Sequence, residues 1–292
     1  MKLNRRNFVK STGIAGLGTV VAPTFFSCAG KPDMKFGLVT YLWGKDWDLP
    51  TLIANCEKSG MQGVELRTQH AHGVETSLSA AQRAEVKKRF DDSPVTCLGY
   101  GSNFEYHSPD PEALRMNIKQ TKEYIKLCRD IGATGIKVKP NTLPPDVPKE
   151  KTFAQIAASL NEIGKFAREY DQLVRVEVHG PYTQELPNMK AIFDQVTESN
   201  VKICWNCNQS DLLPPGLEGN FSMAKEWLGD IIHIHELDKG DYPYPQLFKL
   251  LSGMKYRGWL LLEASSDPAD KIAALKKQLA LFNQLVVEAQ NS

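Results

Sequence analysis

The sequence has no surplus of positive charge beyond its first residues. Its 35 Lys and Arg residues nearly balance its 34 Asp and Glu residues, and four of the bases lie in residues 1–28, which contain no acid. The remainder holds 31 bases against 34 acids, a formal charge of −3. Because non-specific affinity for nucleic acid depends on Lys and Arg side chains that neutralise phosphates, this balance argues against a nucleic-acid partner.

Cysteines are few, and their number after the N-terminal segment is odd. Five follow Cys28, which argues against a framework in which every cysteine is paired. Cys204 and Cys207 have the spacing of a redox pair. Within a strand, however, a rise of ~3.3 Å per residue places their Cα atoms ~10 Å apart, beyond the ~7 Å limit for a disulfide. We therefore expect separate thiols.

No apolar run reaches the ~20 residues that a membrane-spanning helix needs. Instead, Arg5 and Arg6 precede an uncharged stretch over 11–26, which predicts a twin-arginine export signal over 1–28 and a mature domain over 29–292. Phe25-Phe26-Ser27-Cys28 is similar to a lipoprotein processing site, and ordinary cleavage nearby is the alternative. We expect a location in the periplasm or outer cell envelope, with the membrane reached only through a lipid anchor at Cys28.

One pattern repeats from residue 35 onward: a short β-rich run, a polar or Gly/Pro loop, and an amphipathic stretch whose starts are marked by residues such as Asp48, Ser79 and Asp110. Eight such units in ~255 residues predict a single (β/α)8 TIM barrel. A doubly wound open sheet is the alternative, but its Gly-rich phosphate-binding turn is absent after the first strand. The predicted strands are 35–42, 63–68, 95–100, 135–139, 174–179, 202–206, 231–235 and 258–263.

Polar and aliphatic residues alternate inside several of these strands. In Val174-Arg175-Val176-Glu177-Val178-His179 every second residue is polar, and 136–139 and 232–235 repeat the scheme. Side chains two apart share a face of a strand, so a half-buried antiparallel strand would give the same pattern. In a barrel covered by helices the aliphatic set must face the helices. We therefore expect the polar set to point into the barrel, around a polar ligand.

All six histidines and two glutamates fall at the C-terminal ends of predicted strands, where barrel enzymes place their active sites. Glu177 and Glu263 end the fifth and eighth strands, and none of the histidines lies in a predicted helix. Cations such as Mn²⁺, Co²⁺ and Mg²⁺ combine carboxylate and amide oxygens with an imidazole. Strands five to eight supply such a set in Glu177, Asn206, His235 and Glu263.

These motifs resemble those of the xylose isomerase-like TIM barrels, a family of sugar phosphate isomerases and epimerases. The resemblance covers about residues 35–290 and rests on the order of the eight units, Glu177-Val178-His179-Gly180, Trp205-Asn206-Cys207-Asn208, residues 233–238 and Glu263. It implies that Glu177, Asn206, His235 and Glu263 bind one divalent metal (Mn, Co or Mg, with Zn as a further option). It also implies that the two glutamates are the catalytic acid and base. Asn206 stands where an Asp is usual, which removes one negative charge and lowers the expected metal affinity.

The resemblance further implies a small carbohydrate substrate and proton abstraction next to its carbonyl, as in a sugar isomerase or epimerase. Since phosphorylated sugars are cytoplasmic intermediates, we expect an exported member to act on a non-phosphorylated sugar or sugar derivative. Segments 67–73 and 106–110 are similar to substrate-side loops of such barrels. The substrate-binding candidates are His70, His72, His107, Lys139, His179, Asn208 and His233.

Three other interpretations fit the same fold. A 3-keto-glycoside lyase or hydratase would use the same metal and glutamates, with one glutamate protonating a leaving oxygen. A sugar-binding barrel without catalysis would explain Asn206 as a sign of lost activity. A multi-zinc DNA-repair nuclease would need a basic face, which the charge of −3 does not supply. A homo-oligomer is compatible with the sequence.

Overall fold

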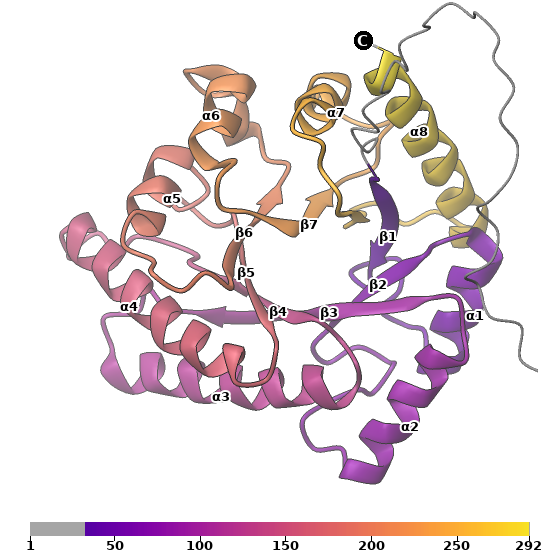
Figure 1. Cartoon of the computed structure of the whole chain (residues 1–292), viewed down its shortest axis with the longest axis horizontal. Helices are drawn as coiled ribbons and strands as arrows, with labels where there is room; N and C mark the ends of the chain where they lie inside the picture. The colour runs from indigo at the N-terminus through magenta and orange to yellow at the C-terminus, as the bar shows by residue number, and fades with distance from the viewer. Residues whose placement is uncertain (1–32, 292) are drawn as a thin grey trace, which may run out of the picture. The chain divides into compact units, whose positions relative to one another are not determined.

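The computed structural model describes residues 33–291. In this range the chain forms a closed barrel of eight parallel strands, in which each strand pairs with the next and the last pairs with the first. Helices follow the strands and surround the barrel (Figure 1). The predicted (β/α)8 fold is confirmed. The predicted signal segment, with Arg5, Arg6 and Cys28, lies outside the described residues.

All eight predicted strands are present, and β3 continues to Glu105 instead of ending at Tyr100. No helix between residues 33 and 291 is both long and apolar enough to cross a membrane. The strands are β1 Lys35–Val39, β2 Gly63–Arg67, β3 Thr96–Glu105, β4 Gly135–Lys139, β5 Leu173–Glu177, β6 Val201–Asn206, β7 Leu228–Ile234 and β8 Trp259–Leu262. The helices are α1 Leu49–Ser59, α2 Ala80–Asp91, α3 Pro111–Asp130, α4 Lys149–Arg168, α5 Leu186–Phe193, α6 Gly216–Ala224, α7 Tyr244–Gly253 and α8 Lys271–Asn291, with a 3₁₀ turn, η1 Gln209–Leu212.

Side-chain caps fix where the first helices begin. The carboxylate of Asp48 accepts the backbone N–H of Thr51 at 2.9 Å at the start of α1. Ser79 and Gln82 form a reciprocal capping box at the start of α2. Such caps satisfy N–H groups that have no partner within the helix, which is why these polar residues mark helix starts in the sequence.

The barrel interior is polar, whereas the layer between strands and helices is apolar. The apolar cluster inside the barrel has only five buried members, Val39, Leu98, Cys204, Ile231 and Leu261, while the aliphatic residues of the alternating strands join the large outer core. Five side chains of Glu, Lys, Arg or His lie inside the barrel at no more than 1% exposure, namely Glu65, Lys137, Arg175, Glu177 and His233. The predicted inward orientation of the polar set is confirmed.

An ion pair links β5 to β7 at a level where two glycines make room for its arginine. Arg175 donates two hydrogen bonds of 2.8 Å to the carboxylate of Asp230 and a third, of 3.2 Å, to the carbonyl oxygen of Leu98. A Cβ atom on Gly99 or Gly135 would lie 2.7 Å from Nη1 of Arg175. Side chains on these neighbouring strands would therefore displace the guanidinium.

The cysteines of the described range, from Cys56 to Cys207, are all free and buried. The prediction that Cys204 and Cys207 are separate thiols is confirmed. Burial raises the pKa of the Cys97 thiol to about 12. Because the thiolate is the reactive form, such a thiol behaves as a small apolar core residue.

Candidate active site

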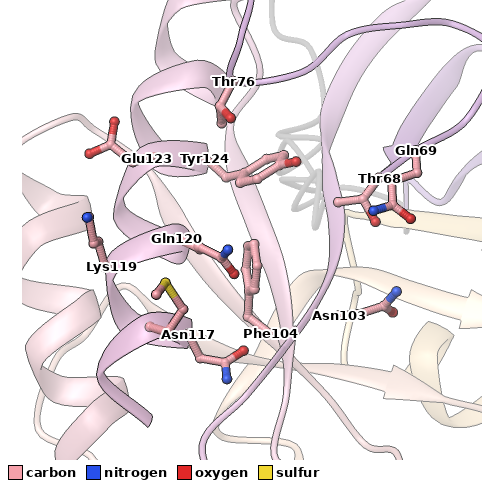
Figure 2. A pocket seen from close by; sticks show the side chains of 11 residues that line it. Thr68, Gln69, Thr76, Asn103, Phe104, Asn117, Lys119, Gln120, Glu123 and Tyr124 are labelled. Atoms are coloured by element: carbon pink, nitrogen blue, oxygen red, sulfur yellow. The ribbon is translucent and has the colours of Figure 1, made fainter. Parts of the chain in front are cut away.

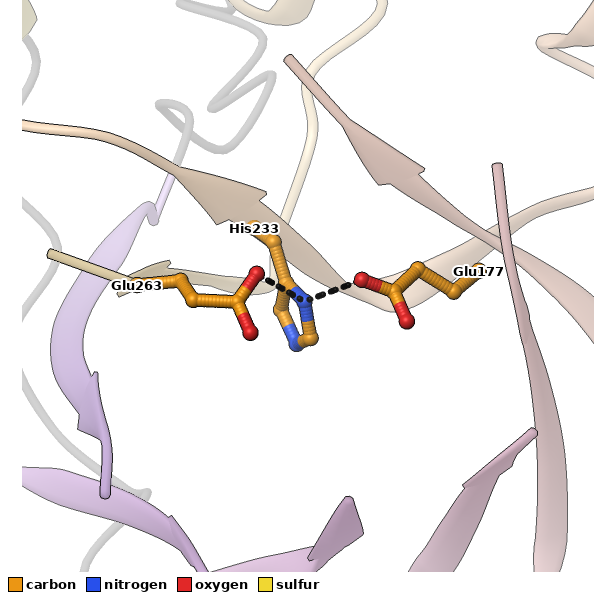
Figure 3. Close-up of side chains that lie close together, drawn as sticks. All are labelled: Glu177, His233 and Glu263. Carbon is orange, nitrogen blue, oxygen red and sulfur yellow. Dashed lines mark ion pairs between the residues drawn. The ribbon is translucent and has the colours of Figure 1, made fainter. Parts of the chain in front are cut away.

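Two glutamates at the C-terminal end of the barrel face one histidine ring. Glu177 is the last residue of β5, and Glu263 directly follows β8, where its N–H donates to the carbonyl oxygen of Ile234 at 2.8 Å. Figure 3 shows both carboxylates directed at the ring of His233 on β7. Nδ1 of His233 lies 3.5 Å from Oε1 of Glu177 and 3.6 Å from Oε2 of Glu263.

The other oxygen of each glutamate faces a cationic side chain. Nζ of Lys137 lies 2.6 Å from Oε2 of Glu177, with both side chains at most 1% exposed. Nη1 of Arg67 donates to Oε1 of Glu263 at 3.0 Å. The amide of Asn206 adds a hydrogen bond of 3.1 Å to Oε1 of Glu177. In each carboxylate, one oxygen therefore contacts a lysine or arginine and the other oxygen faces His233.

These contacts keep both glutamates ionised. Burial alone raises the pKa of Glu177, but the charge of Lys137 and the contact with His233 outweigh it and hold the pKa well below its usual range. Burial is likewise outweighed at Glu263, where the contact with His233 and the charges of His233 and Lys137 lower the pKa to about 2. At neutral pH both groups are thus carboxylates, the form required of a metal ligand or a general base.

A third buried carboxylate lies beneath the histidine. Oε1 of Glu65, on β2, is 3.4 Å from Nε2 of His233, and neither Glu65 oxygen has a hydrogen-bond partner among the described residues. Burial lowers the pKa of His233, but Cys204, Glu65 and Glu177 outweigh burial and raise this pKa well above its ordinary value. The surrounding carboxylates therefore favour the protonated ring, which would have to release a proton before it could bind a metal.

A pocket of about 270 Å³ opens above this cluster. Four of the residues predicted for the site, Lys139, His179, Asn208 and His235, line it together with Asn206 and the two glutamates. Nδ1 of His235 lies 3.1 Å from the backbone oxygen of Glu263, which fixes the ring at the rim. Tyr41, Arg67 and Ser265 complete the lining.

The other predicted histidines lie outside this pocket, on loops that follow β2 and β3. His72 is buried, with Nε2 2.8 Å from the backbone oxygen of Arg67 and Nδ1 accepting the N–H of Val74 at 3.0 Å. Nδ1 of His70 lies 3.1 Å from the hydroxyl of Thr40, and burial lowers the pKa of His70 to about 4. Nδ1 of His107 lies 3.0 Å from the backbone oxygen of Pro140.

The donor set is chemically suited to a divalent cation. Glu177, His233 and Glu263 can each offer one ligand atom, and these atoms all lie within 4.8 Å of one another. Oδ1 of Asn206 is buried and has no hydrogen-bond partner within residues 33–291, so an amide oxygen is also available. Two carboxylates, an imidazole and an amide oxygen match cations of mixed oxygen and nitrogen preference. The compact group contains His233, whereas the family resemblance assigns His235.

The sequence interpretation did not single out Glu65 or Lys137, although a signal for both exists. Each occupies a polar position in an alternating strand, two residues before Arg67 and Lys139 respectively. The parity rule that placed Glu177 inside the barrel therefore places these side chains inside as well. Their partners could not be read from parity, because pairing depends on which strands face each other across the barrel.

Comparison with known proteins agrees with this architecture. The model of the xylose isomerase-like TIM barrel family matches residues 53–211. The chain is similar to 3-keto-D-glucoside 4-epimerase from E. coli, with a TM-score of 0.71 and 16% identity over 86% of this chain and 100% of that one. It is also similar to L-ribulose 3-epimerase (TM-score 0.75, 15% identity, 88% and 96% covered) and to the IolI protein with a bound zinc atom (0.73, 15%, 87% and 99%). At such identities these likenesses show a shared fold.

Proposed function

The chain belongs to the xylose isomerase-like TIM barrel family, and from this premise we propose that it is a sugar isomerase or epimerase. The reaction is removal of a proton from the carbon next to a carbonyl. One observation carries the proposal: Glu177 and Glu263 both line a pocket of about 270 Å³, and each has an oxygen within 3.6 Å of the buried ring of His233. The names of two similar structures, both sugar epimerases, support the same reaction class.

Glu177 and Glu263 have the complementary roles in this proposal. One carboxylate removes the proton, and the other takes up a proton from solvent and delivers it to the opposite face of the carbon. Lys139, which lines the pocket, can donate a hydrogen bond to the oxygen on which negative charge develops. Nδ1 of His179 faces Oδ1 of Asn141 at 3.0 Å, which leaves its Nε2 as an acceptor for a substrate hydroxyl.

We further propose that the site holds one divalent cation, with Mn, Co or Mg favoured and Zn as a further option. Glu177, Asn206 and Glu263 would hold it together with one histidine. When bound, the cation supplies Lewis-acid polarisation of the substrate carbonyl. The cationic partners Lys137 and Arg67 each occupy one carboxylate oxygen and leave the other directed toward the centre of the site.

Metal content tests this part of the proposal. Glu263→Ala should lose most of the bound metal, and Asn206→Asp should retain metal more tightly because it adds a negative charge. His233→Ala and His235→Ala, compared under the same conditions, identify the histidine ligand as the one whose loss lowers metal content. Elemental analysis of purified protein is the readout, with circular dichroism as the control for folding. Unchanged metal content in Glu263→Ala and in both histidine variants would contradict the proposal.

The catalytic assignment is tested by Glu→Gln variants, since the amide keeps the shape of the carboxylate but cannot accept a proton. Glu177→Gln and Glu263→Gln should each lower turnover by about 10²-fold or more, the scale of general acid–base catalysis. In an epimerase, each variant should still exchange the substrate proton of one epimer in D₂O, as seen by NMR. In a lyase or hydratase, only the variant that keeps the base exchanges it. A double variant with near wild-type turnover would refute the assignment.

We also propose that residues 1–28 direct export through the twin-arginine route, and that the substrate is therefore a non-phosphorylated sugar. The Arg5-Arg6 pair before an uncharged stretch supports this location. Replacing both arginines by lysine should leave the precursor in the cytoplasm, measured by cell fractionation. Incorporation of labelled lipid that is lost in Cys28→Ala would identify an anchored protein.

A further inference from the structure

A second cavity, of about 520 Å³, lies beside the pocket that contains the glutamates. It is enclosed by β3, α3 and the loop after β2, and Figure 2 shows Phe104 and Tyr124 near its centre. We propose that this cavity binds the second ring of a neutral glycoside whose first ring lies against Glu177 and Glu263. The placement of the first ring rests on the proposed function, whereas the chemistry of the second cavity is argued from its own residues.

The two cavities meet at one pair of side chains. Arg67 lines the glutamate pocket and donates Nη1 to Glu263 at 3.0 Å, while its Nη2 donates to Oδ1 of Asn103 at 3.2 Å. Asn103 lines the second cavity and keeps its own NH₂ group available. A ligand group that contacts Asn103 is thus only one side chain away from the residue that holds Glu263. A molecule of two linked rings can reach both cavities at once.

The centre of the second cavity is aromatic, and most side chains around it are uncharged. The rings of Phe104 and Tyr124 lie 5.4 Å apart at 58°, and the ring of Phe104 is half-buried. Around them, Thr68, Gln69 and Gln120 present hydroxyl and amide side chains for which no partner is found among the described residues. An apolar ring surface surrounded by uncharged hydrogen-bonding groups suits a sugar ring, which has apolar C–H faces and hydroxyl edges.

The charges of the cavity argue against an anionic ligand. The lining holds one cation, the exposed Lys119, and one anion, Glu123, whose carboxylate lies 2.9 Å from Nζ of Lys126. The guanidinium of Arg67 is already shared between Glu263 and Asn103. A phosphate site typically combines several cations or a bidentate arginine, whereas this lining offers a single lysine together with a carboxylate. The volume of 520 Å³ also falls within the range of about 300–1,000 Å³ typical of small-molecule sites.

The aromatic wall of the second cavity, formed by Phe104 and Tyr124, is held in place before any ligand binds. The hydroxyl of Tyr124 donates to the carboxylate of Glu75, and the hydroxyl of Tyr100 donates to the same group at 3.0 Å. Oε1 of Glu75 also accepts the N–H of Gln69, which ties the loop after β2 to this wall. Because these groups are already ordered, a ligand would bind with little loss of side-chain entropy.

Isothermal titration calorimetry with cellobiose, laminaribiose, maltose, trehalose and glucose tests the proposal. The wild-type protein should bind at least one disaccharide about tenfold or more tightly than glucose, and Phe104→Ala should remove most of that preference. Phe166→Ala is the matched control, since Phe166 is also half-buried and packs on a tyrosine, Tyr170, at 5.0 Å. Gln120→Ala changes an exposed helical residue and should weaken disaccharide binding without affecting the fold.

Two results would overturn the proposal: no disaccharide preference in the wild-type protein, or an equal effect of Phe104→Ala and Phe166→Ala. The titration measures binding alone and uses unoxidised sugars, so it is independent of turnover. If the Glu→Gln variants keep their activity while Phe104→Ala loses disaccharide binding, the reaction class is wrong and the second sugar site stands. The opposite pattern leaves the reaction class intact and removes the second site.

Discussion

Replacement of Lys137 by Met removes one partner of an ion pair that is almost completely buried. Nζ of Lys137 and Oε2 of Glu177 are 2.6 Å apart, a separation at which unit charges attract by about 6 kcal/mol at an effective dielectric constant of about 20. The cost of removing both charges from water offsets much of this attraction. The single substitution, however, leaves Glu177 buried without its nearest cation, and we expect it to lower the free energy of unfolding by about 3–5 kcal/mol.

Urea denaturation at neutral pH measures this loss, with Lys122→Met as the control. Lys122 makes an ion pair of the same length with Glu162, 2.6 Å, but at the surface, where we expect a cost of at most about 1 kcal/mol. Lys137→Met should also raise the pKa of Glu177, so the acidic limb of the pH–rate profile should move to higher pH. Adding Glu177→Gln should recover part of the stability, because it removes the unpaired charge. A loss below about 1 kcal/mol in Lys137→Met, or strict additivity in the double variant, would refute the reasoning.

Two further predictions concern residues around the site. Gly99→Ala should lower the free energy of unfolding by about 1–3 kcal/mol, because its Cβ would meet Arg175 and the backbone of Gly135, both 2.7 Å away; Gly253→Ala, where nothing lies within 4 Å, is the control and should be neutral in thermal unfolding. Glu236 accepts the N–H groups of residues 265 and 266, and these bonds outweigh burial and lower its pKa from 4.5 to about 2. The ionised Glu236 therefore contributes up to about 3 kcal/mol to the free energy of unfolding, which is complete above pH 4.5 and lost as the pH falls toward 2. Glu236→Gln should make the free energy of unfolding, measured by urea titration, depend less on pH across that window. An unchanged dependence would contradict the assignment.

The architecture could be predicted from the sequence because local patterns determine it. Alternation in 136–139 and 174–179 identified strands with a polar inner face, and residues such as Ser79 marked helix starts through local hydrogen bonds. The family resemblance, stated on Glu177, Asn206, His235 and Glu263, is confirmed at the level of the family and the fold.

The partners within the site could not be predicted in the same way. Lys137 reaches Glu177 because β4 and β5 lie side by side in one register, with Val138 opposite Val176. Glu65 approaches His233 from a strand far away in the sequence, and parity says nothing of such pairs. For the same reason, the sequence predicts a substrate-binding role for every histidine near a strand end. The ring of His72 instead makes hydrogen bonds with the backbone of Arg67 and Val74.

The charged interior of the barrel also constrains how this sequence can change over generations. Lys137 pairs with a carboxylate on the neighbouring strand, Arg175 pairs with a carboxylate two strands away, and His233 lies between Glu65 and both glutamates of the site. A substitution that removes one of these charges leaves its partner buried and unpaired, which lowers the free energy of unfolding. Substitutions at these positions should therefore occur in compensating pairs. The loops of this fold can vary one residue at a time, whereas the charged residues inside the barrel should change together.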